Sequence, residues 1–483
     1  MQMLEQIFEM LFKTVEAILR FSVESLEFVL TGKVKQQHSY KAEFAPSWSL
    51  LSSWNTGFCL TGARNLSTKD SYQNALVVGG TGTGKSSVTL LPSLYTMNSS
   101  FIVHDPSGEL FLKSAGALSA RGYAVKILNF ANPEISSGYN PLHRARTSSE
   151  IQKVASMLIE NALGGEKKDP FWNNTAVLLL SLLIRILKNQ PDEYYTLYNV
   201  RQLLNKMGGS PKTVDRLFSE YADDILFDEY KSFLAYDDKV RNGSLATVKA
   251  ALQIFSDEAV ARVTSIDTID FYDFRRGKVA LFIQNSVAEQ KYYSVITSIF
   301  FEQFFNFLLS RFPQNAEQDV FLLIDEASSL KLPTLPLATA NVRKHRAGIM
   351  LIVQDFSQLI HNFGKYEAEA IKANCFAKMY FTGAGLETAR ELEQVLGKFQ
   401  YEDEDKKTIT RELMTRDEIR TMRMNEAILI CGHHSPVRAR LVPYYQRWKY
   451  RAASQLPASY MQTEVPENIP LLSILMPDEE DEE

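Results

Sequence analysis

The chain has 483 residues, of which 45% are hydrophobic and 11% aromatic, enough to form two or three well-packed domains. Its formal charge is −5, but the last six residues, DEEDEE, are all acidic, so the rest of the chain carries a net charge of +1. This balance neither requires nor excludes nucleic acid, whereas three scattered cysteines without CxxC or Cys/His spacing argue against disulfides and a zinc site.

The N-terminal segment, residues 1–40, contains an apolar stripe at helical spacing between residues 3 and 30. We therefore predict an amphipathic helix that docks on a partner or on a membrane. Its polar face carries five glutamates against one lysine and one arginine, and membrane-surface helices favour basic residues, so a partner is preferred. The longest apolar run, AVLLLSLLI (176–184), is about half a membrane span, and the acidic start does not resemble a secretory signal.

Short apolar runs recur along the chain and predict strands. Several are continuously apolar and most are separated by helical segments, a combination typical of a mostly parallel sheet covered on both faces. The fold class is therefore α/β. The predicted strands are 75–78, 101–104, 124–128, 279–283, 320–324, 349–353, 377–381 and 427–430.

A helical stretch interrupts this alternation, because residues 145–265 show helical periodicity and no convincing strand. We interpret it as an all-α domain inserted into a nucleotide-binding domain that comprises residues 41–144 and 266–455. The remaining segment, 456–483, is rich in proline and then acidic, and it predicts a flexible tail with a short apolar segment, LLSILM, that could dock on a partner.

Residues 79–86, GGTGTGKS, match the phosphate-loop pattern GxxxxGK[ST] between a predicted strand and a predicted helix. In such a loop the backbone N–H groups surround the phosphates, Lys85 reaches the β- and γ-phosphate oxygens, and the Ser86 hydroxyl binds Mg²⁺. We predict ATP and Mg²⁺ as ligands. The expected nucleotide-binding residues are Gly79, Gly80, Thr81, Gly82, Thr83, Gly84, Lys85, Ser86 and Ser87.

The second half of the site is predicted at VFLLIDEASSL, residues 320–330, where an apolar strand ends in two carboxylates. Open α/β sheets place ligands at the carboxyl ends of their strands. Asp325 is therefore expected to hold Mg²⁺, and Glu326 to orient the attacking water. The adjacent pair favours hydrolysis over transfer to a small acceptor.

A third group of candidate residues lies at and just before the run RAGIMLIVQ, residues 346–354. Arg343 or Arg346 is expected to reach the γ-phosphate on a neighbouring subunit, and Gln354, at the end of the strand, to sense the phosphate within its own subunit. A solvated basic turn is the alternative for either arginine, and the spacing does not choose between them.

Taken in order around the phosphate loop, several motifs resemble the coupling ATPases of conjugation and type IV secretion, the TraG/TraD-like group. The similarity spans roughly residues 60 to 450. The motifs are IVHDPSGEL (102–110), YNPL (139–142), DPFW (169–172), FLLIDEASSLKLPTLP (321–336), VRKHRAGIMLIVQDFSQL (342–359) and RELMTRDEIRTMRMNEAILICGHHSPV (411–437).

This resemblance implies a RecA-like P-loop ATPase domain with an inserted all-α domain, and a homo-hexameric ring that brings DNA and its relaxase to a type IV secretion channel. It also implies that Asp105 and Glu109 lie near the nucleotide, although Ser107 replaces the lysine of many members. The alignment favours Arg343 over Arg346 as the arginine that acts on a neighbouring subunit. Members usually begin with membrane-spanning helices, so the acidic N-terminal helix here suggests a cytoplasmic protein recruited to the inner membrane through a partner.

Three functions follow from these patterns. The first is a DNA-stimulated ATPase that translocates DNA without sequence preference, with RKHR (343–346) and YYQRWKYR (444–451) as candidate DNA contacts. The second is a receptor that delivers protein effectors to a secretion channel. The third is a nucleotide-binding scaffold without motor activity, which would not need Lys85, Asp325 and Glu326 together.

Overall fold

The structure is a computed structural model that describes residues 40–162, 170–285, 287–402, 404 and 407–473. The predicted N-terminal helix and the acidic end of the tail lie outside the described residues. The described residues divide into two compact units, one that contains residues 40–43 and 393–414 and one that contains residues 44–392 and 415–473.

The larger unit is built on a nine-stranded sheet with the strand order β11-β10-β7-β1-β6-β5-β2-β4-β3. The strands from β7 to β3 pair in parallel, and β10 and β11 pair antiparallel at one edge. The predicted mostly parallel sheet is confirmed, and each predicted apolar run forms a strand. The strands are β1 Ala75–Val78, β2 Ser100–His104, β3 Ala124–Asn129, β4 Val279–Gln284, β5 Val320–Ile324, β6 Ala347–Val353, β7 Ala377–Phe381, β10 Glu426–Cys431 and β11 Val437–Arg440.

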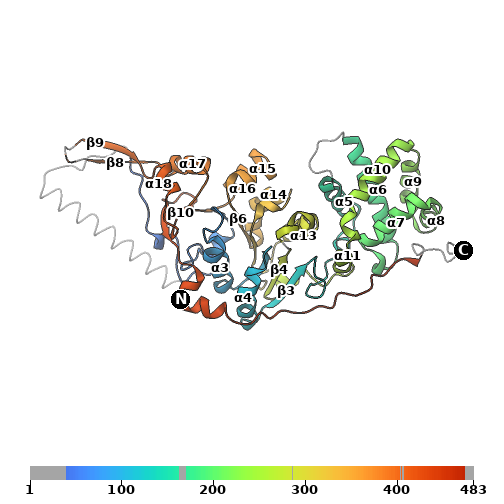
Figure 1. Ribbon diagram of the computed structural model, residues 1–483, viewed down its shortest axis with the longest axis horizontal. Helices are drawn as coiled ribbons and strands as arrows, with labels where there is room; N and C mark the ends of the chain where they lie inside the picture. Colours follow the sequence, from blue (N-terminus) through green and yellow to red (C-terminus); the bar gives the residue numbers. More distant parts are fainter. Residues whose placement is uncertain (1–39, 163–169, 286, 403, 405–406, 474–483) are drawn as a thin grey trace. The chain divides into compact units, whose positions relative to one another are not determined.

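Helices cover both faces of this sheet (Figure 1). Helices α3, α4 and α19 pack on one another over one face, and α13 to α16 pack on one another over the other. All residues of β1, β2, β5 and β6 are buried, which explains their continuous apolar runs. The helices are α2 Thr68–Ser71, α3 Leu91–Thr96, α4 Glu109–Ala120, α12 Asp273–Arg276, α13 Gln290–Ser310, α14 Leu335–Asn341, α15 Phe356–Phe363, α16 Lys365–Ala373, α17 Leu386–Leu396, α18 Arg416–Arg420 and α19 Trp448–Ala453.

Between β3 and β4, the described residues form helices and no strand. Thr196, Asp223, Asp237 and Asp257 each cap a helix by accepting a hydrogen bond from a backbone N–H of its first turn, which explains where these helices begin. The inserted-domain boundaries at 145 and 265 remain a prediction. The helices are α5 Ser148–Ala162, α6 Pro170–Lys188, α7 Leu197–Gly209, α8 Pro211–Tyr221, α9 Asp224–Leu234, α10 Asp238–Ala251 and α11 Glu258–Val263.

Within the described part of the chain, α6 is the one helix long and apolar enough to cross a membrane. Half of its apolar window is buried inside the protein, and α6 packs against α5, α7, α9 and α10. Its length and composition are therefore also those of a central helix in a helical bundle.

Short single-turn helices connect the larger elements. The turn after the phosphate loop, η2 Ser86–Leu90, is π-helical and continues directly into α3. The others are η1 Ser47–Ser49, η3 Pro141–Arg144, η4 Asp192–Tyr194, η5 Gln253–Ser256, η6 Val287–Glu289, η7 Ala327–Ser329, η8 Val342–His345 and η9 Tyr444–Gln446.

The smaller unit contains a two-stranded antiparallel hairpin, β8 Lys398–Glu402 with β9 Thr408–Glu412. Lys398 forms an ion pair with Glu412 across the strands at 3.0 Å, and the rings of Phe399 and Tyr401 stack. The sequence does not predict these strands or β11, because they are rich in charged and polar residues, unlike the buried apolar strands.

The segment at residues 457–472, which we call the strap, is extended and held against the larger unit. Near the sheet, the Met461 N–H donates to the carbonyl oxygen of Val125 on edge strand β3 at 2.8 Å, and Tyr460 packs edge-on against Phe111 of α4. The carbonyl oxygen of Pro457 lies so close to Gly116 of α4 that a Cβ there would be 2.4 Å from it. A glycine is therefore required at position 116.

The other end of the strap lies on the helices between β3 and β4. The Asn199 side chain donates to the carbonyl oxygen of Pro470 at 2.9 Å and accepts from the Leu472 N–H at 3.2 Å. Arg262 donates to the carbonyl oxygen of Pro466 at 3.0 Å. The composition predicts a flexible tail from residue 456, but these bonds and the buried Leu472 hold residues 457–472 in place, and the described start of LLSILM packs on its own chain.

We predict that Gly116→Ala releases the strap without unfolding the sheet. Alanine favours the helix by about 0.5–1 kcal/mol, but its methyl group collides with the backbone of Pro457, and such overpacking costs roughly 1–3 kcal/mol. Hydrogen exchange should become faster at residues 457–472, including the Met461 amide. Gly208→Ala is the matched control, because Gly208 is also helical and has open space around it.

Candidate functional site

The residues predicted to bind phosphate form a loop at the carboxyl end of β1. The Gly79 N–H donates to the carbonyl oxygen of Val353 at 3.2 Å, which joins the start of the loop to the end of the neighbouring strand β6. Gly82 and Gly84 have φ values of 75° and 86°, in the left-handed region that favours glycine. The exposed Thr81 and Gly82 form the tip of the loop.

Internal hydrogen bonds fix the shape of this loop. Thr83 Oγ1 donates to the carbonyl oxygen of Gly80 at 2.8 Å, and Ser87 Oγ donates to that of Gly84 at 2.9 Å. The Lys85 ammonium donates to the carbonyl oxygens of Gly79 and Gly80 at 2.5 and 2.8 Å. Partial burial lowers the pKa of Lys85, while the nearby Asp325 and Glu326 carboxylates oppose that shift.

The acidic pair at the end of β5 lies beside this loop. Ser86 Oγ donates to the Asp325 carboxylate at 3.0 Å, a contact between residues 239 positions apart in the chain. Burial raises the pKa of Asp325, because a carboxylate charge is poorly solvated there. A hydroxyl and a carboxylate oxygen are ligands that Mg²⁺ prefers, and a cation would compensate the buried charge, so the two residues fit a magnesium ion.

Glu326 follows Asp325 with φ 53°, an unusual left-handed conformation for a residue with a side chain. Its N–H donates to the Asp325 carboxylate at 3.1 Å, and it begins the short turn η7. Strained backbone of this kind is concentrated at functional sites. Glu326 is only half-buried, so solvent reaches its carboxylate.

Three further predicted residues lie in the segments that follow the carboxyl ends of neighbouring strands. Gln354 is exposed and directly follows β6, the strand between β1 and β5. Asp105 is buried after β2, and it accepts a hydrogen bond from the Phe111 N–H of α4 at 2.8 Å. Burial raises the pKa of Asp105 to about 6. Glu109 is exposed at the start of α4.

His104 is a residue of this site that the sequence did not single out. It is buried at the end of β2, with Nδ1 2.6 Å from the carbonyl oxygen of Asp325, and burial lowers its pKa to about 4. Its place directly before Asp105 was the available signal. A neutral imidazole there supports the backbone that presents the two carboxylates.

The two candidate arginines lie at the opposite edge of the sheet, before the amino end of β6. Arg343 is exposed and donates to the Gln73 side chain at 3.0 Å. Arg346 donates to the Asp319 carboxylate at 2.8 Å and to backbone carbonyls of residues 314, 315 and 317. The seven residues of β6 span about 23 Å, so neither arginine reaches the phosphate loop of its own chain.

The candidate DNA contacts divide into buried and exposed residues. In RKHR, His345 is buried and stacks on Phe312. Arg343 and Lys344 are exposed. In YYQRWKYR, Tyr450 is buried and stacks on Tyr95, and Arg447 donates to backbone carbonyls of residues 62 and 63. The residues that remain exposed there are Tyr445, Gln446, Trp448, Lys449 and Arg451.

Known proteins resemble this chain in sequence. Protein VirD4 of Agrobacterium fabrum is 22% identical over 414 residues, which cover 78% of this chain and 59% of that protein. Conjugal transfer protein TraG of Escherichia coli is 23% identical over 387 residues, which cover 73% of this chain and 58% of that protein. The chain thus spans less than two thirds of the length of these relatives.

The solved structures of the bacterial conjugative coupling protein TrwB share the fold. TrwBdeltaN70 in complex with sulphate has a TM-score of 0.68 at 18% identity and covers 85% of this chain and 96% of its own. TrwB in complex with ADP and Mg²⁺ has a TM-score of 0.67 at 17% identity and covers 88% of this chain and 99% of its own. The predicted RecA-like α/β fold with additional helices is therefore confirmed.

The family described as "Type IV secretory system Conjugative DNA transfer" matches residues 33–468, most of the chain. That range includes the phosphate loop, the acidic pair and the described helices between β3 and β4. The chain belongs to this family of type IV secretory system proteins for conjugative DNA transfer.

Proposed function

We propose that this protein is a coupling protein that hydrolyses ATP to recruit and move DNA, with its relaxase, toward a type IV secretion channel. The observation that carries the proposal is the 3.0 Å contact between Ser86 and Asp325, which brings the phosphate loop and the acidic pair to one place. The family assignment and the nucleotide complexes of TrwB support it.

In this proposal each residue has one task. The backbone N–H groups of residues 79–84 and the Lys85 ammonium hold the phosphates, and Ser86 and Asp325 hold Mg²⁺, which draws charge from the phosphoryl oxygens when it is bound. Glu326 orients the attacking water and accepts its proton. Gln354, between the two halves of the site, contacts the γ-phosphate.

Hydrolysis also requires a second copy of the chain in this proposal. Arg343 lies at the sheet edge opposite its own phosphate loop and is exposed, so it fits the phosphate of a neighbouring copy. Arg346 is already committed to Asp319 and to three backbone carbonyls. We therefore assign the trans-acting role to Arg343 and propose a closed ring, a hexamer by family resemblance.

Glu326→Gln tests turnover separately from binding. The amide keeps the shape of the side chain but does not accept the proton from water, so hydrolysis should fall by roughly 10²–10⁴ while ATP still binds. Lys85→Ala should weaken ATP binding itself, because it removes the charge that faces the phosphates. Both are measured by phosphate release and by binding of a fluorescent ATP analogue. Full DNA-transfer activity of Glu326→Gln would favour a nucleotide-binding scaffold instead.

Mixing variants tests the role of Arg343 between subunits. Arg343→Ala should reduce hydrolysis by roughly 10³-fold and preserve ATP binding. A mixture of Arg343→Ala with Lys85→Ala should recover part of the activity, because some interfaces then join an intact arginine to an intact phosphate loop.

Arg346→Ala is the control in the same turn. It should lower the melting temperature by a few degrees, because it breaks the bonds to Asp319 and the 314–317 backbone, and it should not impair hydrolysis by the folded protein. If Arg346→Ala lost hydrolysis while Arg343→Ala retained it, the assignment would be reversed.

DNA stimulation tests the motor itself. Purified protein should hydrolyse ATP faster when single-stranded or duplex DNA is added, and the stimulation should decrease as salt rises, because counterions compete for the same phosphate contacts. Equal rates with and without DNA over a range of salt concentrations would remove the main support for translocation.

A further inference from the structure

A basic pocket at the β10–β11 edge of the sheet lies outside the nucleotide site. Its volume is about 370 Å³, and its lining contains three arginines and one glutamate, a local net charge of +2 in a chain whose overall charge is negative. The only apolar side chain in the lining is that of Ala439. The lining residues are Arg423, Asn425, Glu426, Arg438, Ala439 and Arg440.

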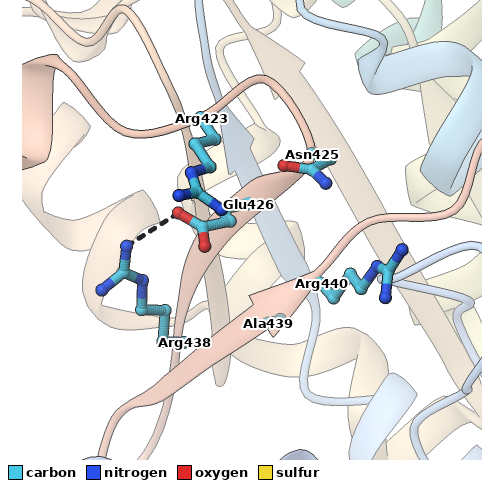
Figure 2. A pocket seen from close by; sticks show the side chains of 6 residues that line it. All are labelled: Arg423, Asn425, Glu426, Arg438, Ala439 and Arg440. Atoms are coloured by element: carbon cyan, nitrogen blue, oxygen red, sulfur yellow. Dashed lines mark hydrogen bonds and ion pairs between the residues drawn. The ribbon is translucent and has the colours of Figure 1, made fainter.

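The strand geometry explains why the arginines gather there. On β11, Val437 and Ala439 point into the core, so Arg438 and Arg440 project together from the other face. Glu426 is paired with Arg440 in the strand register, but its carboxylate accepts a hydrogen bond from Arg438 at 2.8 Å. Figure 2 shows Arg438 bonded to Glu426, with the guanidinium of Arg440 directed away from that carboxylate.

Two of the three guanidiniums are thus available to a ligand. Arg423 and Arg440 are exposed, and neither has a side-chain hydrogen bond or an ion pair to any residue that the structure describes. Arg423 lies near enough to Glu426 to help hold the pKa of that carboxyl below its usual range, after the larger effect of Arg438. Arginine forms paired hydrogen bonds with phosphate oxygens, which the Asn425 amide could supplement.

The pocket is close to the proposed nucleotide site. Strand β10 runs antiparallel to β7, with Ala427 opposite Phe381, the last residue of β7. Glu426 and Arg440 therefore lie at the same end of the strands as the carboxyl end of β1, where the phosphate loop begins. Strand β11 is three strand positions from β1, a separation of about 14 Å.

The turn after β7 connects the two sites. Thr382 Oγ1 donates to the carbonyl oxygen of Met422, next to Arg423, at 2.7 Å. One residue further, the carbonyl oxygen of Gly383 would lie 3.6 Å from a Cβ on Gly80 in the phosphate loop. One turn therefore lies beside both the phosphate loop and the residue that precedes Arg423.

We propose that Arg423, Arg438 and Arg440 form a phosphate-binding pocket that grips the sugar–phosphate backbone of DNA. This inference rests on the proposed function, which requires contacts independent of sequence. The polar lining favours a phosphodiester, because protein partners usually bury apolar and aromatic side chains. A free nucleotide fits less well, since no aromatic side chain lines the pocket to stack on a base. Edge strands also carry charges simply to prevent aggregation, and that role alone would not affect DNA binding.

The test uses the full chain and a fluorescein-labelled DNA oligonucleotide, with affinity measured by anisotropy between about 50 and 200 mM salt. Arg423→Ala combined with Arg440→Ala should weaken binding roughly tenfold at low salt and reduce the slope of log affinity against log salt by about one to two. Glu426→Gln should have the opposite effect and tighten binding, because it frees Arg438. Arg216→Ala, an exposed charge on α8, is the matched control.

ATP hydrolysis without DNA should be unchanged in these variants, which shows that they are folded. If the wild type binds DNA and the double variant binds equally well with the same salt slope, the pocket assignment is overturned and the proposed function stands. If the wild type binds no DNA, both are overturned. If ATP alone displaced DNA from this pocket, the pocket would be assigned to a nucleotide. If the double variant lost assembly while its salt slope stayed unchanged, the pocket would be assigned to a contact between copies. Either result would also overturn the inference.

Discussion

The hydrogen bond from Ser86 to Asp325 depends on the arrangement of the parallel strands. Strands β1, β6 and β5 are neighbours in this order, and all three end at the same edge of the sheet. The phosphate loop, Gln354 and the two carboxylates therefore lie side by side although long segments of chain separate them. Because a parallel sheet is buried on both faces, its apolar strands hold these loops on a rigid base.

The two edges of the sheet have different roles in the proposed motor. The carboxyl edge carries the nucleotide residues and, three strands along, the arginine pocket. The amino edge carries Arg343, which is separated from the phosphate loop of its own chain by the length of β6. Under the proposed function, one copy would contain an incomplete site, and a ring of copies would complete each site while bringing many arginine pockets to one DNA molecule. Repeated weak contacts of this kind bind a backbone without fixing its sequence.

The strap adds a long-range connection within the larger unit. Helix α4 begins at the Asp105 turn beside the acidic pair, and the same helix carries Gly116 and Phe111, which receive the strap. The strap then bonds to Asn199 on α7 and Arg262 on α11. The strap is thus a second connection, besides the chain itself, between the sheet near Asp105 and the helices between β3 and β4.

The strands of the parallel sheet, the phosphate loop and the acidic pair could be predicted from the order of the amino acids. Buried strands must be apolar along their whole length, and a phosphate loop requires glycine, lysine and a hydroxyl at fixed spacing, so these features depend on local patterns. Only the tertiary structure showed that Arg346 is bonded to residues 314–319 while Arg343 is exposed, because the partners of Arg346 come from another loop. It alone also revealed β11, the docking of residues 457–472 and the grouping of Arg423 with Arg438 and Arg440. Each of these depends on contacts between distant residues, and such contacts leave no periodicity in the chain.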